Sequence, residues 1–420
     1  MNSAIQADSA NAPLLLNSLV PHIIYLNDDQ VRHDAFARVL CAVAVLPSRE
    51  QVRSMEAIAK NLQSVHDETL NEHLFVRLKH LAFNASDNSV AALRVIVDAI
   101  AGRPFEQRAA LFNEMIGKVS SVPANQRSSI LLPLASYIEW LRPNAARTVA
   151  YDAVFQAVCA IPENSKPAVA AELFYQIRSL HDDDTRLLRF VTAIEFVGSQ
   201  SIGSRREMIY ALQNIIWHHP DAFTVLHCLD DFLALSRSQP SPFHRQNLLR
   251  LFGIANEEYS ANFRFSIARK LVDEITTLSI HEQALAFGTA AAHTVRIGSP
   301  YIEPMIVRVM RQVQALPGLQ RVEAMAEVTL QFESLIDAID FDPEEDDEYE
   351  PDSLPDSFFG VLETTEYLPD DLRIHVLTRV KTLLDRCPPA LMLIARQTLA
   401  DAVNVLPIAL INRLTSLQPA

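Results

Sequence analysis

Glycine is scarce in this chain, with 9 residues in 420, whereas a typical protein contains about 7 % glycine. Phosphate-binding loops, dinucleotide-binding folds and tight β-hairpins need glycine, because it alone adopts positive φ angles without a steric penalty. Nucleotide-binding enzymes are therefore disfavoured. Runs of alternating β-branched residues are also missing, while alanine and leucine abound, so the composition favours an all-α fold.

Long apolar runs and paired cysteines are missing as well. No run approaches the roughly 20 residues needed to span a bilayer, so we expect no membrane span. The four cysteines, Cys41, Cys159, Cys228 and Cys387, lie far apart without a CxxC pair. Each lies within or at the end of an apolar stretch, so we expect buried free thiols in a reducing compartment.

Lysine is rare among the basic residues, which divide into 30 Arg and 6 Lys, and the formal net charge is -15. Binding to a phosphate backbone needs clustered Lys and Arg, so we expect no nucleic-acid partner. Codon bias in a GC-rich genome accounts for the Arg excess. A second interpretation is that a protein acting inside a eukaryotic cell benefits from few lysines, because lysine is the ubiquitin acceptor.

Enzyme and metal signatures are missing too. The sequence contains no HExxH, no GxSxG, no glycine-rich phosphate loop and no Cys/His spacing that closes a zinc site. We therefore predict no catalytic residues, no cofactor and no metal ligands.

A repeat of 38 or 39 residues organises the chain. Its markers, most of them proline, are Pro47, Ala85, Pro123, Pro162, Ser201, Pro240, Ser279, Pro317, Pro369 and Pro407. Proline is favoured at the start of a helix, where its missing N–H has no partner to lose. Every residue eleven positions after the first nine markers is apolar: Ile58, Ile96, Leu134, Leu173, Leu212, Leu251, Ala290, Val328 and Val380. These residues define the buried stripe of one helix, helix A.

A second apolar stripe lies seven residues before each marker and defines helix B. It comprises Leu40, Leu78, Ile116, Phe155, Ile194, Leu233, Val272, Met310, Leu362 and Ala400. A hairpin of two such helices cannot bury its apolar faces alone and must stack on its neighbours. The sequence therefore predicts an all-α solenoid of about ten antiparallel helical hairpins. We expect a disordered polar leader at residues 1–7, the repeat array at 8–406 and a closing half-repeat at 407–420.

One interval, from Pro317 to Pro369, is 52 residues long and holds an acidic insertion at about residues 340–353, "DFDPEEDDEYEPDS". Both helices of this repeat keep their stripes, so the insertion is predicted between the two helices of one hairpin. A calcium loop is excluded because glycine at position 6 and glutamate at position 12 are missing. We interpret the stretch as a disordered loop that is either an inert spacer or a docking segment for a basic partner or for the protein's own middle. The candidate partner-binding residues are Glu344, Glu345, Asp346, Asp347, Glu348, Tyr349 and Glu350.

The period, the two-helix unit and the proline near the start of helix A resemble the HEAT and armadillo class of α-solenoids over nearly the whole chain. The inter-helix Asp and following Arg of HEAT repeats are not kept. Basic residues nevertheless stand four positions after several markers, at Arg127, Lys166, Arg205, Arg321 and Arg373. We expect them to cap a helix or to pair within the repeat.

An acidic, Arg-rich solenoid with the polar leader "MNSAIQADSANAP" is also similar to bacterial type III effectors. That resemblance implies a non-catalytic protein-binding scaffold and virulence factor, made in the bacterial cytoplasm and secreted into the host cytoplasm to bind a host protein. The alternative is a housekeeping bacterial cytoplasmic adaptor or assembly factor on the same solenoid. The sequence leaves the oligomeric state open.

Two further groups of residues were considered. Titratable residues gather near the second hairpin, at His66, Asp67, Glu68, Glu72, His73 and His80, and we expect an ordinary solvated loop and helix start there. Trp140 and Trp217 follow helix A stripes, so both are predicted in the core.

Overall fold

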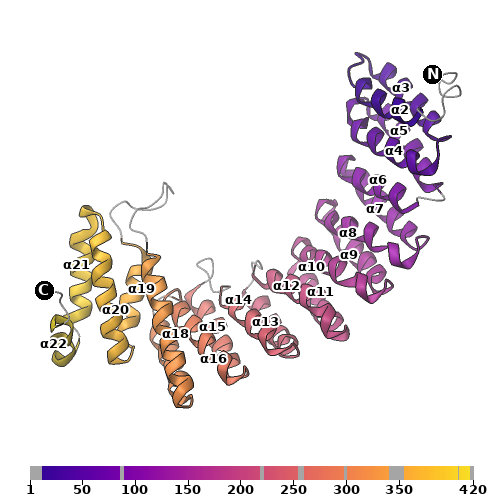
Figure 1. Ribbon diagram of the computed structural model, residues 1–420. Coiled ribbons are helices and arrows are strands. Elements are labelled where there is room, and N and C mark those ends of the chain that lie inside the picture. The colour runs from indigo at the N-terminus through magenta and orange to yellow at the C-terminus, as the bar shows by residue number, and fades with distance from the viewer. Residues whose placement is uncertain are drawn as a thin grey trace. The chain divides into compact units, whose positions relative to one another are not determined.

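The computed structural model describes residues 12–85, 89–217, 222–253, 260–297, 300–339, 354–404 and 406–416. Within these ranges all regular secondary structure is α-helix or 3-10 helix. The chain divides into two compact units, 1–215 and 216–420, and Figure 1 labels most of their helices. The predicted leader at residues 1–7 and the acidic insertion at 340–353 lie outside the described residues.

Unit 1 is a stack of helical hairpins. Its helices are α2 (Ala12–Ile23), α3 (Asp29–Val43), α4 (Ser48–Asn61), α5 (Glu68–Phe83), α6 (Ser89–Ala99), α7 (Phe105–Val119), α8 (Ser128–Ser136), α9 (Asn144–Cys159), α10 (Lys166–Tyr175) and α11 (Asp183–Ser199), followed by α12 (Ile202–Trp217). Short 3-10 turns such as η1 (Leu62–Ser64) and η2 (Ile100–Gly102) continue several of the A helices. The A helices α2, α4, α6, α8 and α10 contact one another in succession, as do the B helices α3 with α5 and α7 with α9.

Unit 2 repeats this arrangement. Its helices are α13 (Ala222–Arg237), α14 (Ser241–Phe252), α15 (Ala261–Ile275), α16 (Ile280–Thr294), α17 (Ile302–Ala315), α18 (Gly318–Asp337), α19 (Asp356–Thr365), α20 (Asp370–Leu383), α21 (Pro389–Asn404) and α22 (Ile408–Ser416). One layer runs α14, α16, α18, α20, α22 and the other α13, α15, α17, α19, α21. The predicted solenoid of about ten antiparallel hairpins with a 38 to 39 residue period is confirmed.

The repeat markers stand directly before the A helices or within a few residues of them. Pro47, Pro240 and Ser279 have φ between -53° and -59° and ψ between 142° and 149°, an extended conformation that proline's fixed φ favours. The nine predicted stripe residues of helix A are all at most 1 % exposed. The marker sequence therefore sets both where helix A begins and which face it buries.

The helix B stripe is shifted by one residue in three repeats. Ile116 and Phe155 are half-buried and Ala400 is exposed. The residues before two of these, Met115 and Val154, are completely buried instead, and Leu399 is also buried. The predicted offset was wrong there because a one-residue shift turns a helix by about 100°.

Arginines four residues after three markers tie each A helix to the end of the preceding B helix. Each guanidinium donates to the carbonyls one and three residues before the marker, which have no partner within their own helix. The bonds run from Arg127 to Ser120 and Val122, from Arg205 to Gly198 and Gln200, and from Arg373 to Glu366 and Leu368. The predicted capping role is confirmed for these three, whereas Lys166 instead lies over the Phe196 ring at 5.8 Å.

Replacing Arg373 with methionine is expected to lower the free energy of unfolding of unit 2 by about 1–2 kcal/mol, because two carbonyl oxygens lose their charged donor. Arg321 is the matched control, since it occupies the same offset on α18 and its side chain makes no such bond among the described residues. Urea unfolding followed by circular dichroism measures both variants. Equal losses for Arg373→Met and Arg321→Met would show that the carbonyl bonds contribute nothing.

Helix α19 packs at Gly360 against Val295, the residue that follows helix α16. A Cβ at this position would lie 2.8 Å from the carbonyl oxygen of Val295, whereas a Cβ at Gly117 of α7 would meet nothing within 4 Å. Gly360→Ala is therefore expected to destabilise unit 2 by about 1–3 kcal/mol through overpacking. Gly117→Ala should stabilise unit 1 by about 0.5–1 kcal/mol, because alanine loses less backbone entropy in a helix. Thermal unfolding that moves in the same direction for both variants would contradict the close packing at Gly360.

Candidate functional site: a cleft between two adjacent repeats

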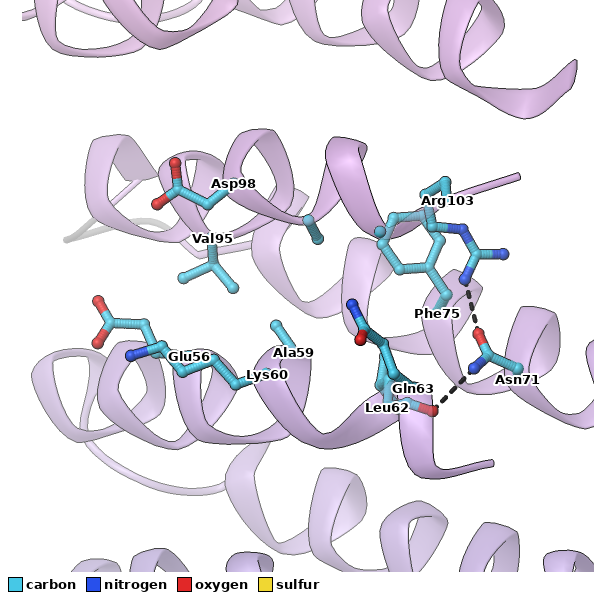
Figure 2. Close-up of a pocket in the computed structure, with 12 residues that line it drawn as sticks. Glu56, Ala59, Lys60, Leu62, Gln63, Asn71, Phe75, Val95, Asp98 and Arg103 are labelled. Atoms are coloured by element: carbon cyan, nitrogen blue, oxygen red, sulfur yellow. Dashed lines mark hydrogen bonds between the residues drawn. The ribbon is translucent and has the colours of Figure 1, made fainter. Parts of the chain in front are cut away.

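A cleft of about 460 Å³ opens in unit 1 between the A helices α4 and α6, with one side formed by α5. Figure 2 shows the residues that line it. They are Glu56, Ala59, Lys60, Leu62, Gln63, Asn71, Phe75, Val95, Asp98, Ala99, Gly102 and Arg103. Its volume lies in the range of about 300–1,000 Å³ that is typical of ligand sites.

Helical spacing and small side chains create this cleft. Glu56 and Lys60 are four residues apart on α4, so they lie on one face of that helix. The small side chains of Ala59 on α4 and Ala99 on α6 leave space between these two helices, and Gly102 leaves space at the end of η2. A Cβ on Gly102 would lie 2.9 Å from the Gln63 Nε2 atom, so the glycine lets the Gln63 side chain lie against the backbone.

Arg103 holds the wall at one end of the cleft. Its side chain is buried, and it donates to Asn71 Oδ1 at 2.6 Å, to Gln107 Oε1 at 2.9 Å and to the Glu72 carboxylate. The guanidinium carbon lies 4.3 Å from the centre of the Phe75 ring. Burial lowers the pKa of Arg103, and the Glu72 charge opposes this shift. Because these partners all belong to the protein itself, Arg103 has a structural role in the cleft.

Asn71 links this wall to the end of the preceding helix A. Its side-chain amide donates to the carbonyls of Leu62 at 2.8 Å and Val65 at 3.1 Å, which are the first residue of η1 and the residue that follows it. The amide therefore satisfies the last carbonyls of the α4 segment while its oxygen accepts from Arg103. Two neighbouring repeats are joined through this one side chain, which fixes the cleft's shape.

The rest of the cleft carries polar side chains that can bind a ligand: Glu56, Lys60 and Asp98 lie at the end away from Arg103, and Gln63 lies nearer to it (Figure 2). Asp98 accepts from Arg94 Nε at 2.8 Å, so its charge is balanced. Within the part of the chain that the structure describes, Glu56 and Lys60 enter no ion pair, and the Gln63 amide makes no hydrogen bond. A carboxylate, an ammonium group and an amide can bind charged side chains and peptide groups. The cleft therefore combines polar and charged side chains with the apolar side chains of Leu62, Phe75 and Val95, as sites that bind a ligand do.

A serine, a histidine and a glutamate that no sequence motif indicated meet in unit 2. Ser236 Oγ lies 3.0 Å from His244 Nδ1, and His244 Nε2 lies 3.4 Å from Glu274 Oε1. This order of groups would suit an activated nucleophile. Ser236 is only 1 % exposed, however, and its oxygen also accepts from the Asn247 amide at 3.2 Å. With no access for a substrate, the cluster is a buried polar network.

The candidate residues predicted from sequence fall in three groups. Glu344, Glu345, Asp346, Asp347, Glu348, Tyr349 and Glu350 lie outside the described residues, between the end of α18 at Asp337 and the start of α19 at Asp356. Asp67 caps α5 by accepting from the Leu70 N–H at 3.0 Å, as a helix start requires. Glu72 and His73 instead contact neighbouring repeats, at Arg103 and at His33.

Burial was predicted wrongly for two of the four cysteines, because Cys41 and Cys159 are exposed, whereas Cys228 and Cys387 are buried as expected. The prediction for Trp140 was wrong as well. This side chain is 52 % exposed, because helix α8 ends at Ser136 and the tryptophan stands in the 3-10 turn η4 (Ile138–Trp140). The side chain of Trp217 lies outside the described residues. Two structural absences complete the picture: the described ranges contain no helix long and apolar enough to cross a membrane, and no group of three or more His, Cys, Asp or Glu residues that could hold a metal ion.

No protein-family model and no curated protein matches this sequence. Among solved structures, the chain is similar to Kap121p in a crystal structure of Kap121p bound to Nup53p, with a TM-score of 0.46 and 10 % identity. The similarity covers 97 % of this chain and 47 % of that one, so this chain spans about half of its length. A circular tandem repeat protein with a novel repeat topology is similar with a TM-score of 0.30 and 12 % identity, over 96 % of this chain and 97 % of the other. The assignment as an α-solenoid rests on the helix pairing described above.

Proposed function

We propose that this protein is a non-catalytic scaffold that binds a partner protein through the cleft between α4 and α6. The observation that carries this proposal is the cleft itself, in which Glu56 and Lys60 enter no ion pair and the Gln63 amide makes no hydrogen bond among the described residues. Arg103 and Asn71 tie the neighbouring repeats together at one end of the cleft, so the backbone around it needs little reordering when the partner binds. The buried Ser236 network gives no support to a hydrolytic function.

The test is to block the cleft without disturbing the fold. Ala59→Trp places a large side chain in the cleft, and Ala110→Trp places the same side chain on the exposed surface of α7. Capture of a partner from host lysate should be saturable with the unaltered protein, lost with Ala59→Trp and retained with Ala110→Trp. Circular dichroism and thermal unfolding verify that both variants fold. Equal capture by all three proteins would contradict binding at the cleft.

We further propose that the scaffold is a secreted bacterial effector whose partner is a host protein. Support comes from the Arg-rich, acidic composition and the polar first residues. The decisive measurement fuses residues 1–50 to a secretion reporter in a bacterium with a type III system. Export that stops when the system is disabled supports the effector, whereas retention in the bacterial cytoplasm supports a housekeeping adaptor or assembly factor.

The acidic residues Glu344, Glu345, Asp346, Asp347, Glu348, Tyr349 and Glu350 are proposed as a second contact, for a basic surface of the partner. Deleting residues 340–353 should leave the thermal unfolding of the protein unchanged and weaken partner binding. The affinity of the deletion variant should also depend less on salt than that of the unaltered protein. A deletion variant with unaltered affinity at low and high salt would identify the stretch as an inert spacer.

A further inference from the structure

Two histidines from adjacent repeats meet on the B layer of unit 1. His33 belongs to α3 and His73 to α5, and these two helices pack against each other. His33 Nε2 and His73 Nδ1 lie 2.8 Å apart, and the ring centres are 5.1 Å apart. His33 is buried, whereas His73 is exposed. Two ring nitrogens therefore face each other at a place that solvent reaches.

A neighbouring carboxylate sets the tautomer of neutral His33. Asp34 Oδ1 lies 3.1 Å from His33 Nδ1 and also accepts from the Gln30 amide at 3.0 Å. Since an ionised carboxylate only accepts, the proton of neutral His33 is on Nδ1, and its Nε2 lone pair points at His73. In metal-binding histidines the far ring nitrogen almost always donates to a carboxylate, a backbone carbonyl or a water molecule, and Asp34 provides such an acceptor here.

We propose that His33 Nε2 and His73 Nδ1 form a binding site for a divalent transition metal ion such as Zn²⁺. Imidazole nitrogen suits Zn²⁺, Cu²⁺ and Ni²⁺, whereas Mg²⁺ and Ca²⁺ require oxygen ligands. On binding, the ion exchanges two of its water ligands for the two nitrogens. The His73 proton moves through water from Nδ1 to the outward Nε2, so both rings stay neutral.

Both rings must shift to bind an ion. Zn–N bonds of about 2.0–2.1 Å in a tetrahedral site place two ligand nitrogens roughly 3.3 Å apart, compared with 2.8 Å here, and the rings must tilt so that both lone pairs point at the ion. His73 is exposed, so most of this movement falls to its ring. Water fills the remaining positions, because the described residues provide no third ligand. The bound ion joins the first two hairpins of unit 1.

The test titrates zinc into the full chain after treatment with a chelator, followed by isothermal titration calorimetry. The unaltered protein and His80→Ala should each bind one zinc ion, whereas His73→Ala should bind none. His80 is the matched control because it is exposed on the same helix, two turns further on. Asp34→Asn should weaken binding about 10–100-fold, as expected when the carboxylate that orients a metal ligand is lost.

Thermal unfolding provides the second readout. Zinc should raise the melting temperature of the unaltered protein and of His80→Ala, but not that of His73→Ala, because only a ligand of the folded state stabilises it. Without zinc, the melting temperature of His73→Ala verifies that the variant is folded. The proposal is overturned if the unaltered protein shows no saturable zinc binding, if Mg²⁺ binds equally well, or if His73→Ala still binds the same ion.

Discussion

Replacing Arg103 with methionine is expected to lower the free energy of unfolding of unit 1 by about 2–4 kcal/mol, because three acceptors lose a charged donor while the Glu72 side chain, which is 41 % exposed, is still reached by solvent. The guanidinium serves the carboxylate of Glu72, the amide oxygens of Asn71 and Gln107, and the face of the Phe75 ring. Methionine fills much of the volume but donates no hydrogen bond. Urea unfolding followed by circular dichroism measures the loss.

Two further variants sharpen this prediction. Arg103→Lys should recover only part of the stability, because an ammonium group cannot make the forked contacts of a guanidinium. Arg49→Met is the control, since Arg49 is exposed on α4 and surface substitutions usually change stability by less than about 0.5 kcal/mol. An Arg103→Met protein as stable as Arg49→Met would show that the cleft wall does not depend on this residue.

Unit 2 is expected to lose about 3 kcal/mol of stability between pH 7 and pH 4 through His293 alone. Burial lowers the pKa of His293 from 6.5 to about 4, and the charge of Arg296 acts in the same direction. The ring stacks on Phe252 with 5.7 Å between the centres, and its buried Nδ1 has no partner. The unfolded chain therefore takes up a proton near pH 6.5, before the folded protein does. The stability is fully present above pH 6.5 and is lost as the pH falls toward 4.

His293→Phe tests this prediction, because phenylalanine keeps the ring contact and cannot take up a proton. Unfolding free energies measured at several pH values should show the variant gaining on the unaltered protein as the pH falls from 6.5 to 4. His281→Phe, an exposed change on the same helix α16, should retain the original pH dependence. Parallel curves for His293→Phe and the unaltered protein would rule out His293 as the acid-sensitive group.

The positions of helix A could be predicted from sequence because the same physical constraint recurs in every repeat. Pro47 and its counterparts set the helix start, and Ile58 and its counterparts are buried in all nine cases. Helix B was harder, because no residue marks its start, and at Ile116 the stripe moved to Met115. Trp140 was misplaced since the sequence does not show that α8 ends at Ser136.

The cleft and the histidine pair could not be predicted, because each joins residues from different repeats. In the sequence, Ala59 and Ala99 cannot be distinguished from alanines of the core. Only the packing of α4 beside α6 shows that they leave a space. His33 and His73 are 40 residues apart, so their contact depends on how α3 stacks on α5. A repeat period predicts which helices are neighbours. Which side chains face one another depends on how each helix is rotated about its own axis.

The most direct test of the proposed binding function is site-specific photo-crosslinking. A photoreactive amino acid is placed at Gln63, which lines the cleft, and separately at the exposed Ala110 of α7. Each protein is irradiated in host lysate and, in parallel, with an excess of protein that carries no photoreactive group. A saturable adduct with one partner, formed from Gln63 but not from Ala110 and suppressed by the excess, is the predicted result. No adduct from Gln63, or the same adducts from both positions, would contradict a partner in the cleft.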